Sequence, residues 1–311
     1  MSTRTVPQTA SRGKLIAAFA AVYIIWGSTY LAIRFALETL PPFLMAGVRF
    51  LTAGAIVYGF LVARGAAHPT RRNWRDGLIV GGFLLLGGNG GVVWSEQFVP
   101  SGIAALLVAT LPIWMVLFDW LRGTGQRPGA RTAIGIGLGL AGLVVLIGPG
   151  SLGADGMPIV PALVLVLASV AWAWGSLYSR GAAKPSSPMM ATAIQMLCGG
   201  ALLTIAGTAA GEWGELDLAG ASTRSVLALL YLLLAGSIVG YSAYIWLLEH
   251  TSPANVATYA YVNPVVAVFL GWLLASEPIT PRVLIAAAII VLGVAVIVSA
   301  PSRKPAPVRE V

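Results

Sequence analysis

The sequence predicts an all-α integral membrane protein of ten transmembrane helices, arranged as two inverted repeats of five helices. Three observations predict this fold: the composition, ten continuous apolar runs, and a short motif that occurs once in each half of the chain. Of the 311 residues, 58% are hydrophobic and 10% are charged, and the mean hydropathy is +0.85. A soluble domain carries roughly 25% charged residues, so this composition excludes a water-exposed surface of the necessary size.

Each apolar run is about 20 residues long, which is the length a helix needs to cross the hydrocarbon core of a bilayer. The runs are continuous rather than alternating, which favours helices and excludes a transmembrane β-barrel. The first run is long and lacks a small-residue cleavage site, which favours a permanent helix over a signal peptide. The predicted spans are residues 15–37, 43–63, 77–95, 101–121, 132–148, 159–179, 188–210, 225–248, 253–275 and 282–300.

Basic residues predict the orientation of these spans, because cytoplasmic loops carry an excess of lysine and arginine. With a cytoplasmic N-terminus, fifteen of the 19 basic residues fall on the cytoplasmic side and only Arg224 and Arg282 fall outside. The remaining two, Arg34 and Arg49, lie within spans. We therefore expect a multi-pass protein of a bacterial-type inner membrane, with both termini in the cytoplasm. Anionic lipid explains the net charge of +8, with no need for a nucleic-acid partner.

The repeated motif is Trp-Gly-Ser-x-Tyr, which begins at Trp26 and again at Trp174. Five spans per half is an odd number, so the second half enters the membrane from the opposite side, as in many transporters. The residues that follow each motif make Arg49 and Gln195 equivalent positions of the repeat. We expect a cytoplasmic tail at 1–14, the first repeat at 15–148, a periplasmic linker at 149–158, the second repeat at 159–300, and a disordered cytoplasmic tail at 301–311.

Several strings extend these observations: Tyr-Ile-Ile-Trp-Gly-Ser-Thr-Tyr at 23–30, Pro-Pro at 41–42 with Ala-Gly-Val-Arg-Phe at 46–50, Pro-Ser-Gly-Ile-Ala-Ala at 100–105, Gly-Ser-Ile at 236–238, Ser-Pro-Ala at 252–254, and Tyr-Ala-Tyr-Val-Asn-Pro-Val at 259–265. From about Leu15 to Ser299 the chain resembles the EamA family of the drug/metabolite transporter superfamily. The resemblance implies a ten-helix carrier with inverted halves that moves small metabolites, often outward. Members of this kind include amino-acid exporters, and others move sugars or purine-related compounds.

Aromatic and amide side chains within the spans predict a central pocket. Asn89 lies in the string Gly-Gly-Asn-Gly-Gly, where glycines weaken a helix and expose its backbone. Close packing of helices through small residues is the alternative reason for these glycines, and lipid or helix packing is the alternative for the aromatic residues. The candidate substrate-binding residues are Trp26, Tyr30, Asn89, Trp94, Trp114, Trp174, Tyr178, Tyr241, Tyr244, Tyr259, Tyr261 and Asn263.

Charged residues at membrane depth are costly and usually face a cavity or a partner. Arg34 lies four residues before Glu38, a spacing that permits either a same-face pair or an arginine reaching the interface. Arg49 lies about 10 Å along the second span, from a rise of roughly 1.5 Å per residue. Glu96 ends the third span at a similar depth. We therefore expect an Arg49–Glu96 contact that either joins the helices or closes the exit, with Arg34 as a further gate or ion-pair candidate.

The expected function is that of a secondary transporter that moves small metabolites by alternating access, with amino acids or similar compounds as exported substrates. An apolar pocket with a few hydroxyls and amides suits an amphipathic zwitterion or a modest polar metabolite. Another metabolite, a lipid-like substrate, a membrane enzyme and a non-transporting protein stay open as alternatives. The expected partners are a small-molecule substrate and membrane lipid, without nucleic acid, and a monomer is compatible with the sequence.

Catalytic and metal-binding motifs are not expected. His68 and His250 are isolated, and Cys198 is the single cysteine, so no metal, disulfide or cofactor is predicted. The glycine pattern at 137–142 matches a dinucleotide-binding motif in letters only, because it lies within an apolar span with no preceding strand.

Overall fold

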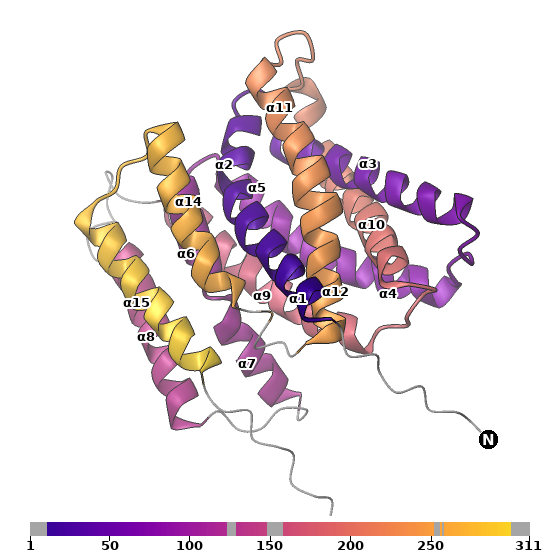
Figure 1. Ribbon diagram of the computed structural model, residues 1–311. Coiled ribbons are helices and arrows are strands. Elements are labelled where there is room, and N and C mark those ends of the chain that lie inside the picture. The colour runs from indigo at the N-terminus through magenta and orange to yellow at the C-terminus, as the bar shows by residue number, and fades with distance from the viewer. Residues whose placement is uncertain (1–10, 123–128, 148–157, 252–255, 257, 300–311) are drawn as a thin grey trace, which may run out of the picture.

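A computed structural model describes residues 11–122, 129–147, 158–251, 256 and 258–299. Every regular element in these ranges is helical. The predicted terminal tail at 301–311, nearly all of the linker at 149–158 and most of the tail at 1–14 lie outside the described residues. Figure 1 shows the helices as a bundle in which segments from the two halves of the chain are interleaved.

The helices of the first half are α1 (Arg12–Ala20), η1 (Ala21–Ile25), α2 (Trp26–Ala36), α3 (Pro42–Ala63), α4 (Arg71–Gly81), η2 (Gly82–Gly90), α5 (Gly91–Ser95), α6 (Ser101–Val108), α7 (Leu111–Leu121) and α8 (Ala130–Ile147). Those of the second half are α9 (Ile159–Gly181), α10 (Pro188–Ala209), η3 (Glu212–Gly214), α11 (Thr223–Tyr231), η4 (Leu232–Tyr241), α12 (Ser242–His250), α14 (Tyr259–Ala275) and α15 (Pro281–Val298). Three of these are π-helical segments within longer rods: η1, η2 and η4.

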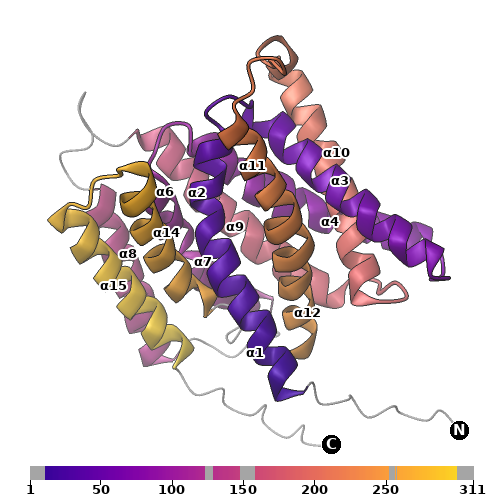
Figure 2. The ribbon, with the colours of Figure 1, turned by 45° about the horizontal axis from the view of Figure 1, so that its top comes forward.

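Among the described residues, seven helical rods are long and apolar enough to cross a membrane: Arg12–Ala36, Pro42–Ala63, Arg71–Ser95, Ser101–Leu121, Ile159–Gly181, Pro188–Ala209 and Thr223–His250. Shorter apolar helices cover Val262–Ala275 and Pro281–Gly293. Helix α1 begins and α15 ends at the same end of the bundle (Figures 1 and 2). The structure therefore supports an integral membrane protein, while ten crossings and cytoplasmic termini stay predictions.

Local sequence explains where several helices begin. Pro42 occupies the first turn of α3 and Pro188 the first turn of α10, where a missing backbone N–H costs little. Thr70 and Asn73 form a reciprocal capping box at the start of α4. Pro112 lies in the first turn of α7, and a short turn divides the rod Ser101–Leu121 into α6 and α7.

Contacts between helices form a pattern that is unchanged when the two halves are exchanged. Helix α3 packs along α10, and α8 packs along α15. The rod of α4, η2 and α5 packs against α9, and the rod of α11, η4 and α12 packs against that of α1, η1 and α2. Likewise α7 contacts α9, α14 contacts α2, and α14 meets α6. The two halves therefore bury each other rather than forming separate units.

Glycines allow the central pair of helices to approach closely. A Cβ atom added at Gly54 of α3 would lie 2.9 Å from the backbone nitrogen of Leu197 in α10. One added at Gly200 of α10 would lie 2.7 Å from the nitrogen of Leu51 in α3. The pairs 51–200 and 54–197 run in opposite directions, so the helices are antiparallel. Membrane helices associate through such close packing because lipid supplies no hydrophobic force between them.

Carboxylates from the second half cap helices of the first half at one end of the bundle, which we call the Glu277 end. Glu212 accepts hydrogen bonds from the backbone nitrogens of Phe43 (3.1 Å) and Leu44 (2.8 Å) at the start of α3. Glu277 accepts from Ser101 (2.8 Å) and Gly102 (3.2 Å) at the start of α6. Both carboxylates satisfy donors that a helix leaves unpaired and oppose the positive end of its dipole.

Replacing Glu212 with Ala is expected to destabilise the protein by about 2 kcal/mol, because two buried N–H groups lose their acceptor. Thermal unfolding in detergent measures the change. Glu215→Ala is the matched control, since Glu215 is exposed one turn away and makes no such cap. Equal effects of the two substitutions would contradict a capping role.

Candidate functional site

A central cavity of about 80 Å³ lies between the two halves. A buried water needs roughly 10–15 Å³ on this scale, so the space fits several waters or a small metabolite. Its walls are mostly apolar and aromatic, with a few polar groups, as is usual for ligand sites. The lining residues are Trp26, Thr29, Tyr30, Ile33, Arg49, Phe50, Gly88, Asn89, Val92, Val108, Ala168, Trp172, Gly236, Tyr259 and Asn263.

Five rings form an aromatic cluster beside this cavity: Trp26, Trp172, Tyr241, Tyr244 and Tyr259. The rings of Trp26 and Trp172 meet edge to face with centroids 5.5 Å apart, and Trp26 meets Tyr259 in the same way at 5.5 Å. Tyr244 lies 4.9 Å from Trp26 and 5.6 Å from Trp172. These distances are within the favourable range for aromatic pairs, so the cluster is a connected wall.

The rings of the two tryptophans in the cluster pack against glycines of the π-helical segments. A Cβ atom at Gly88 would lie 2.5 Å from the ring of Trp172, and one at Gly240 would lie 2.5 Å from Nε1 of Trp26. Gly88 belongs to η2 and Gly240 to η4, which are corresponding rods of the two halves. π-Helical turns often occur at functional sites. The glycine string around Asn89 thus provides both a loosened helix and space for a tryptophan.

These contacts correct the predicted equivalence of Trp26 and Trp174. Trp172 is the residue that makes the same contact as Trp26, and the two are 146 positions apart, as are Arg49 and Gln195. Trp174 is two residues further along α9 and faces away from the cavity, where it contacts Phe83 and Phe118. Two residues correspond to about 200° around a helix, so the repeated motif is offset from the spatial repeat.

Arg49 and Gln195 make corresponding contacts with different chemistry. Nη2 of Arg49 donates to Oδ1 of Asn89 at 3.2 Å. In the other half, the hydroxyl of Tyr241 donates to Oε1 of Gln195 at 2.8 Å. The expected Arg49–Glu96 ion pair is absent from the contacts of the described residues, because the partner of Arg49 is the amide of Asn89. One half therefore holds a charge at this position and the other holds a neutral amide.

Arg34 also has a partner that its sequence neighbourhood did not indicate. Its Nε lies 3.6 Å from Oε1 of Glu277 in the second half, instead of pairing with Glu38. Glu38 pairs with Arg224 at 3.0 Å. Both ion pairs join the two halves at the Glu277 end, consistent with the prediction of Arg34 as an ion-pair candidate.

Glu96 is buried at the Glu277 end with 1% of its surface exposed, and neither carboxyl oxygen has a hydrogen-bond partner. Burial raises the pKa of Glu96 well above its ordinary value, the nearby Glu277 raises it further, and Arg34 lowers it in part. An unpaired buried carboxylate is costly, so the folded protein favours the protonated acid.

Glu96→Gln is expected to flatten the dependence of stability on pH. As pH rises above about 4.5, the unfolded chain ionises at Glu96 while the folded protein keeps the proton, so the free energy of unfolding falls until the raised pKa is passed. Melting temperatures of purified protein across this pH range measure the slope. Glu215→Gln, at an exposed carboxyl, is the control and should retain the slope.

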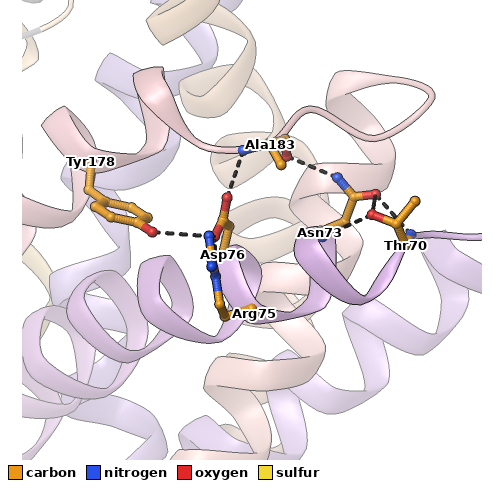
Figure 3. A network of polar contacts seen from close by, with 6 residues as sticks. All are labelled: Thr70, Asn73, Arg75, Asp76, Tyr178 and Ala183. Atoms are coloured by element: carbon orange, nitrogen blue, oxygen red, sulfur yellow. Dashed lines mark hydrogen bonds and ion pairs between the residues drawn. The ribbon is translucent and has the colours of Figure 1, made fainter.

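The opposite end of the bundle, which we call the Asp76 end, carries a second polar network (Figure 3). Oδ1 of Asp76 accepts from Arg75 Nη2 at 2.7 Å and from the hydroxyl of Tyr178 at 3.3 Å, and its Oδ2 accepts from the backbone nitrogen of Ala183 at 2.7 Å. The amide of Asn73 donates to the carbonyl of Ala183 at 3.0 Å. The network ties the start of α4 to the segment between α9 and α10.

A second cavity of about 160 Å³ lies beside this network and is lined in part by Asp76, Lys184, Gln195 and Glu249. Lys184 and Glu249 form an ion pair at 3.3 Å. Tyr241 lies between the two cavities: its ring packs against the central-cavity residues Phe50 and Trp172, while its hydroxyl bonds Gln195.

The sequence-predicted pocket residues thus fall into groups. The structure brings Trp26, Tyr30, Asn89, Tyr259 and Asn263 together around the central cavity, and Tyr241 and Tyr244 belong to the aromatic cluster beside it. The others lie elsewhere: Tyr178 joins the Asp76 network, Trp174 packs against Phe118, Trp94 packs against Phe98, and Trp114 donates to Thr110. The side chain of Tyr261 lies outside the described residues.

Sequence reasoning missed several wall residues, among them Thr29, Phe50 and Trp172. The offset of 146 between Arg49 and Gln195 was the signal that could have identified Trp172. Within the described ranges, no group of three His, Cys, Asp or Glu side chains is placed to hold a metal ion.

Comparison with known proteins gives a family for this arrangement. The model of the EamA-like transporter family matches the chain twice, over residues 13–148 and 160–299. The chain belongs to this family. The Escherichia coli K12 protein named uncharacterized inner membrane transporter YedA is 43% identical over 284 residues, which cover 91% of this chain and 90% of YedA. The uncharacterized transporter YoaV of Bacillus subtilis is 23% identical and covers 90% of this chain and 95% of its own length.

The fold is also found among solved structures. A crystal structure described only as that of a protein has a TM-score of 0.67 and 23% identity, and the match covers 92% of this chain and 97% of that one. Likeness at this level of identity concerns the fold alone. Together with the apolar rods, the family match and the likeness to YedA identify the chain as a multi-pass inner-membrane transporter.

Proposed function

We propose that this transporter moves small metabolites, amino acids or amino-acid-like compounds first among them, by alternating access around the central cavity, and that its net direction is export. One observation carries the proposal: the cavity lies between the two halves and combines an aromatic wall with Arg49, Asn89 and Asn263. An amphipathic zwitterion needs this mixture of apolar surface and a few polar contacts.

Two features support an inverted repeat as the basis of the movement. The family model matches each half once, and equivalent helices such as α3 and α10 pack antiparallel. In an inverted repeat, rocking of one half against the other exposes a shared site to each side in turn. The predicted topology places the Asp76 end in the cytoplasm and the Glu277 end outside.

Contacts on either side of the central cavity supply closures at both ends. Toward the Asp76 end, the bond between Tyr241 and Gln195 stands between the central cavity and the second one. Toward the Glu277 end, the ion pairs of Arg34 with Glu277 and of Arg224 with Glu38 join the halves. Alternating access requires one set of contacts to open while the other stays closed, so neither set is expected to be very strong.

Purified protein in liposomes, loaded with unlabelled amino acids, is expected to accumulate the matching labelled amino acid by counterflow. Accumulation needs a carrier that alternates, so a channel or a non-transporting protein gives none. Empty liposomes are the control. Absence of flux for every amino acid, other small metabolites and lipids, with folding verified by a cooperative melt, would contradict the proposed transport.

Trp172→Phe and Trp174→Phe form a matched pair that tests the location of the site. Trp172→Phe removes the bond from its Nε1 to the hydroxyl of Tyr244, which is 2.9 Å long, and alters the cavity wall. One net hydrogen bond corresponds to about 2–10-fold in affinity, so the half-saturation concentration for transport should rise by this factor. Trp174→Phe, on the other face of α9, should leave it unchanged. The reverse order would place the site elsewhere.

A further inference from the structure

Arg49 carries a buried charge for which the described structure supplies no counterion. Its side chain is 4% exposed and lines the central cavity, and Nη2 bonds only the neutral amide of Asn89. Nε and Nη1 are buried with no hydrogen-bond partner. None of the described residues that line the cavity is acidic, and the ion pairs of the described chain do not include Arg49.

Such an arrangement is unfavourable for stability alone. A buried charge without a partner costs several times what a hydrogen bond contributes. The ring of Phe50, 4.1 Å from the guanidinium carbon, recovers only part of this cost. The equivalent position in the other half shows what helix packing requires there, because Gln195 is neutral and its oxygen is satisfied by Tyr241.

The missing partner has a definite chemistry. Free guanidinium donors suit the oxygens of an anion, and a carboxylate, the anionic group of an amino acid, forms short, charge-assisted hydrogen bonds with arginine. The rings of Trp26, Trp172 and Tyr259 line the same cavity as Arg49 and suit an apolar or aromatic portion of the same molecule. A ligand ammonium would find ring faces and amides but no carboxylate.

We infer that Arg49 is the receptor for the carboxylate of the transported metabolite, so that a substrate carboxylate completes the half-formed ion pair of the cavity. The inference rests on the proposed function and narrows its substrates to small organic carboxylates with an apolar tail, including zwitterionic amino acids. The anion determines recognition, and the ammonium group contributes less. Only the half that contains Arg49 has this receptor, so the two sides of the cavity hold the substrate unequally.

Matched compounds test the receptor. Two series of inhibitors of counterflow are compared, one with the side chain of leucine and one with that of phenylalanine. Each series contains the amino acid, its amide, the amine without the carboxyl group and the acid without the amino group. The amino acid and the des-amino acid should inhibit wild-type protein about 10–100-fold more strongly than the amide or the amine, the factor expected for a charge-assisted hydrogen bond. In Arg49→Gln this preference should disappear, and Arg49→Lys should retain part of it.

Stability provides a measurement that needs no ligand. If Arg49 is kept for a substrate, Arg49→Gln relieves a buried charge and should raise the melting temperature by roughly 2–4 °C. If Arg49 is a structural residue, the same substitution should lower it. Arg64→Gln is the matched control, because Arg64 follows the same helix, is exposed, and should change neither the melting temperature nor the preference for carboxylates.

The outcomes separate the two claims. Equal inhibition by carboxylates and amides, or a lower melting temperature in Arg49→Gln with its carboxylate preference intact, overturns the receptor while leaving transport in place. Flux of some other metabolite that carries no anionic group would do the same. If the wild-type protein transports none of the compounds, the proposed transport is overturned, and the receptor with it.

Discussion

Close approach of helix backbones is the constraint on which the rest of this structure depends. Lipid offers no hydrophobic drive for helix association, so van der Waals contact between helices has to supply it. Gly54 and Gly200 let α3 and α10 touch backbone to backbone, and Gly142 and Gly293 do the same for α8 and α15. Each of these pairs joins one half of the chain to the other. The shared cavity exists because the halves are held together along these seams, at its sides.

Glycine also determines the interior of the cavity. Gly88 and Gly240 leave space in which the rings of Trp172 and Trp26 pack. Both glycines lie in π-helical segments, whose wider turns leave irregular backbone beside the site. The glycines weaken these two helices beside the cavity, where a ligand is expected to bind. A side chain at either glycine would displace a tryptophan from the aromatic wall.

Polar groups in the bundle divide into those that are satisfied and those that are not. Glu212, Glu277 and Asp76 are buried, and each accepts a hydrogen bond from the backbone of a segment distant in the sequence. Arg49 and Glu96 are also buried, but Nε and Nη1 of Arg49 and both carboxyl oxygens of Glu96 have no hydrogen-bond partner. Buried polar groups without partners are rare in native structures and call for a functional reason. The structural carboxylates lie at the two ends of the bundle, whereas Arg49 lies at the cavity.

The sequence by itself determined the properties that depend on local composition and length. Apolar runs identified the helical rods, and the strings around Trp26 and Pro100 indicated the family. It did not determine which face of each helix points inward. Trp172 rather than Trp174 lines the cavity, Arg49 meets Asn89 rather than Glu96, and Arg34 meets Glu277 from the far half of the chain. These choices depend on the rotation and offset of packed helices, which only the tertiary structure decides, because side-chain contacts between distant segments leave no periodic trace in either segment alone.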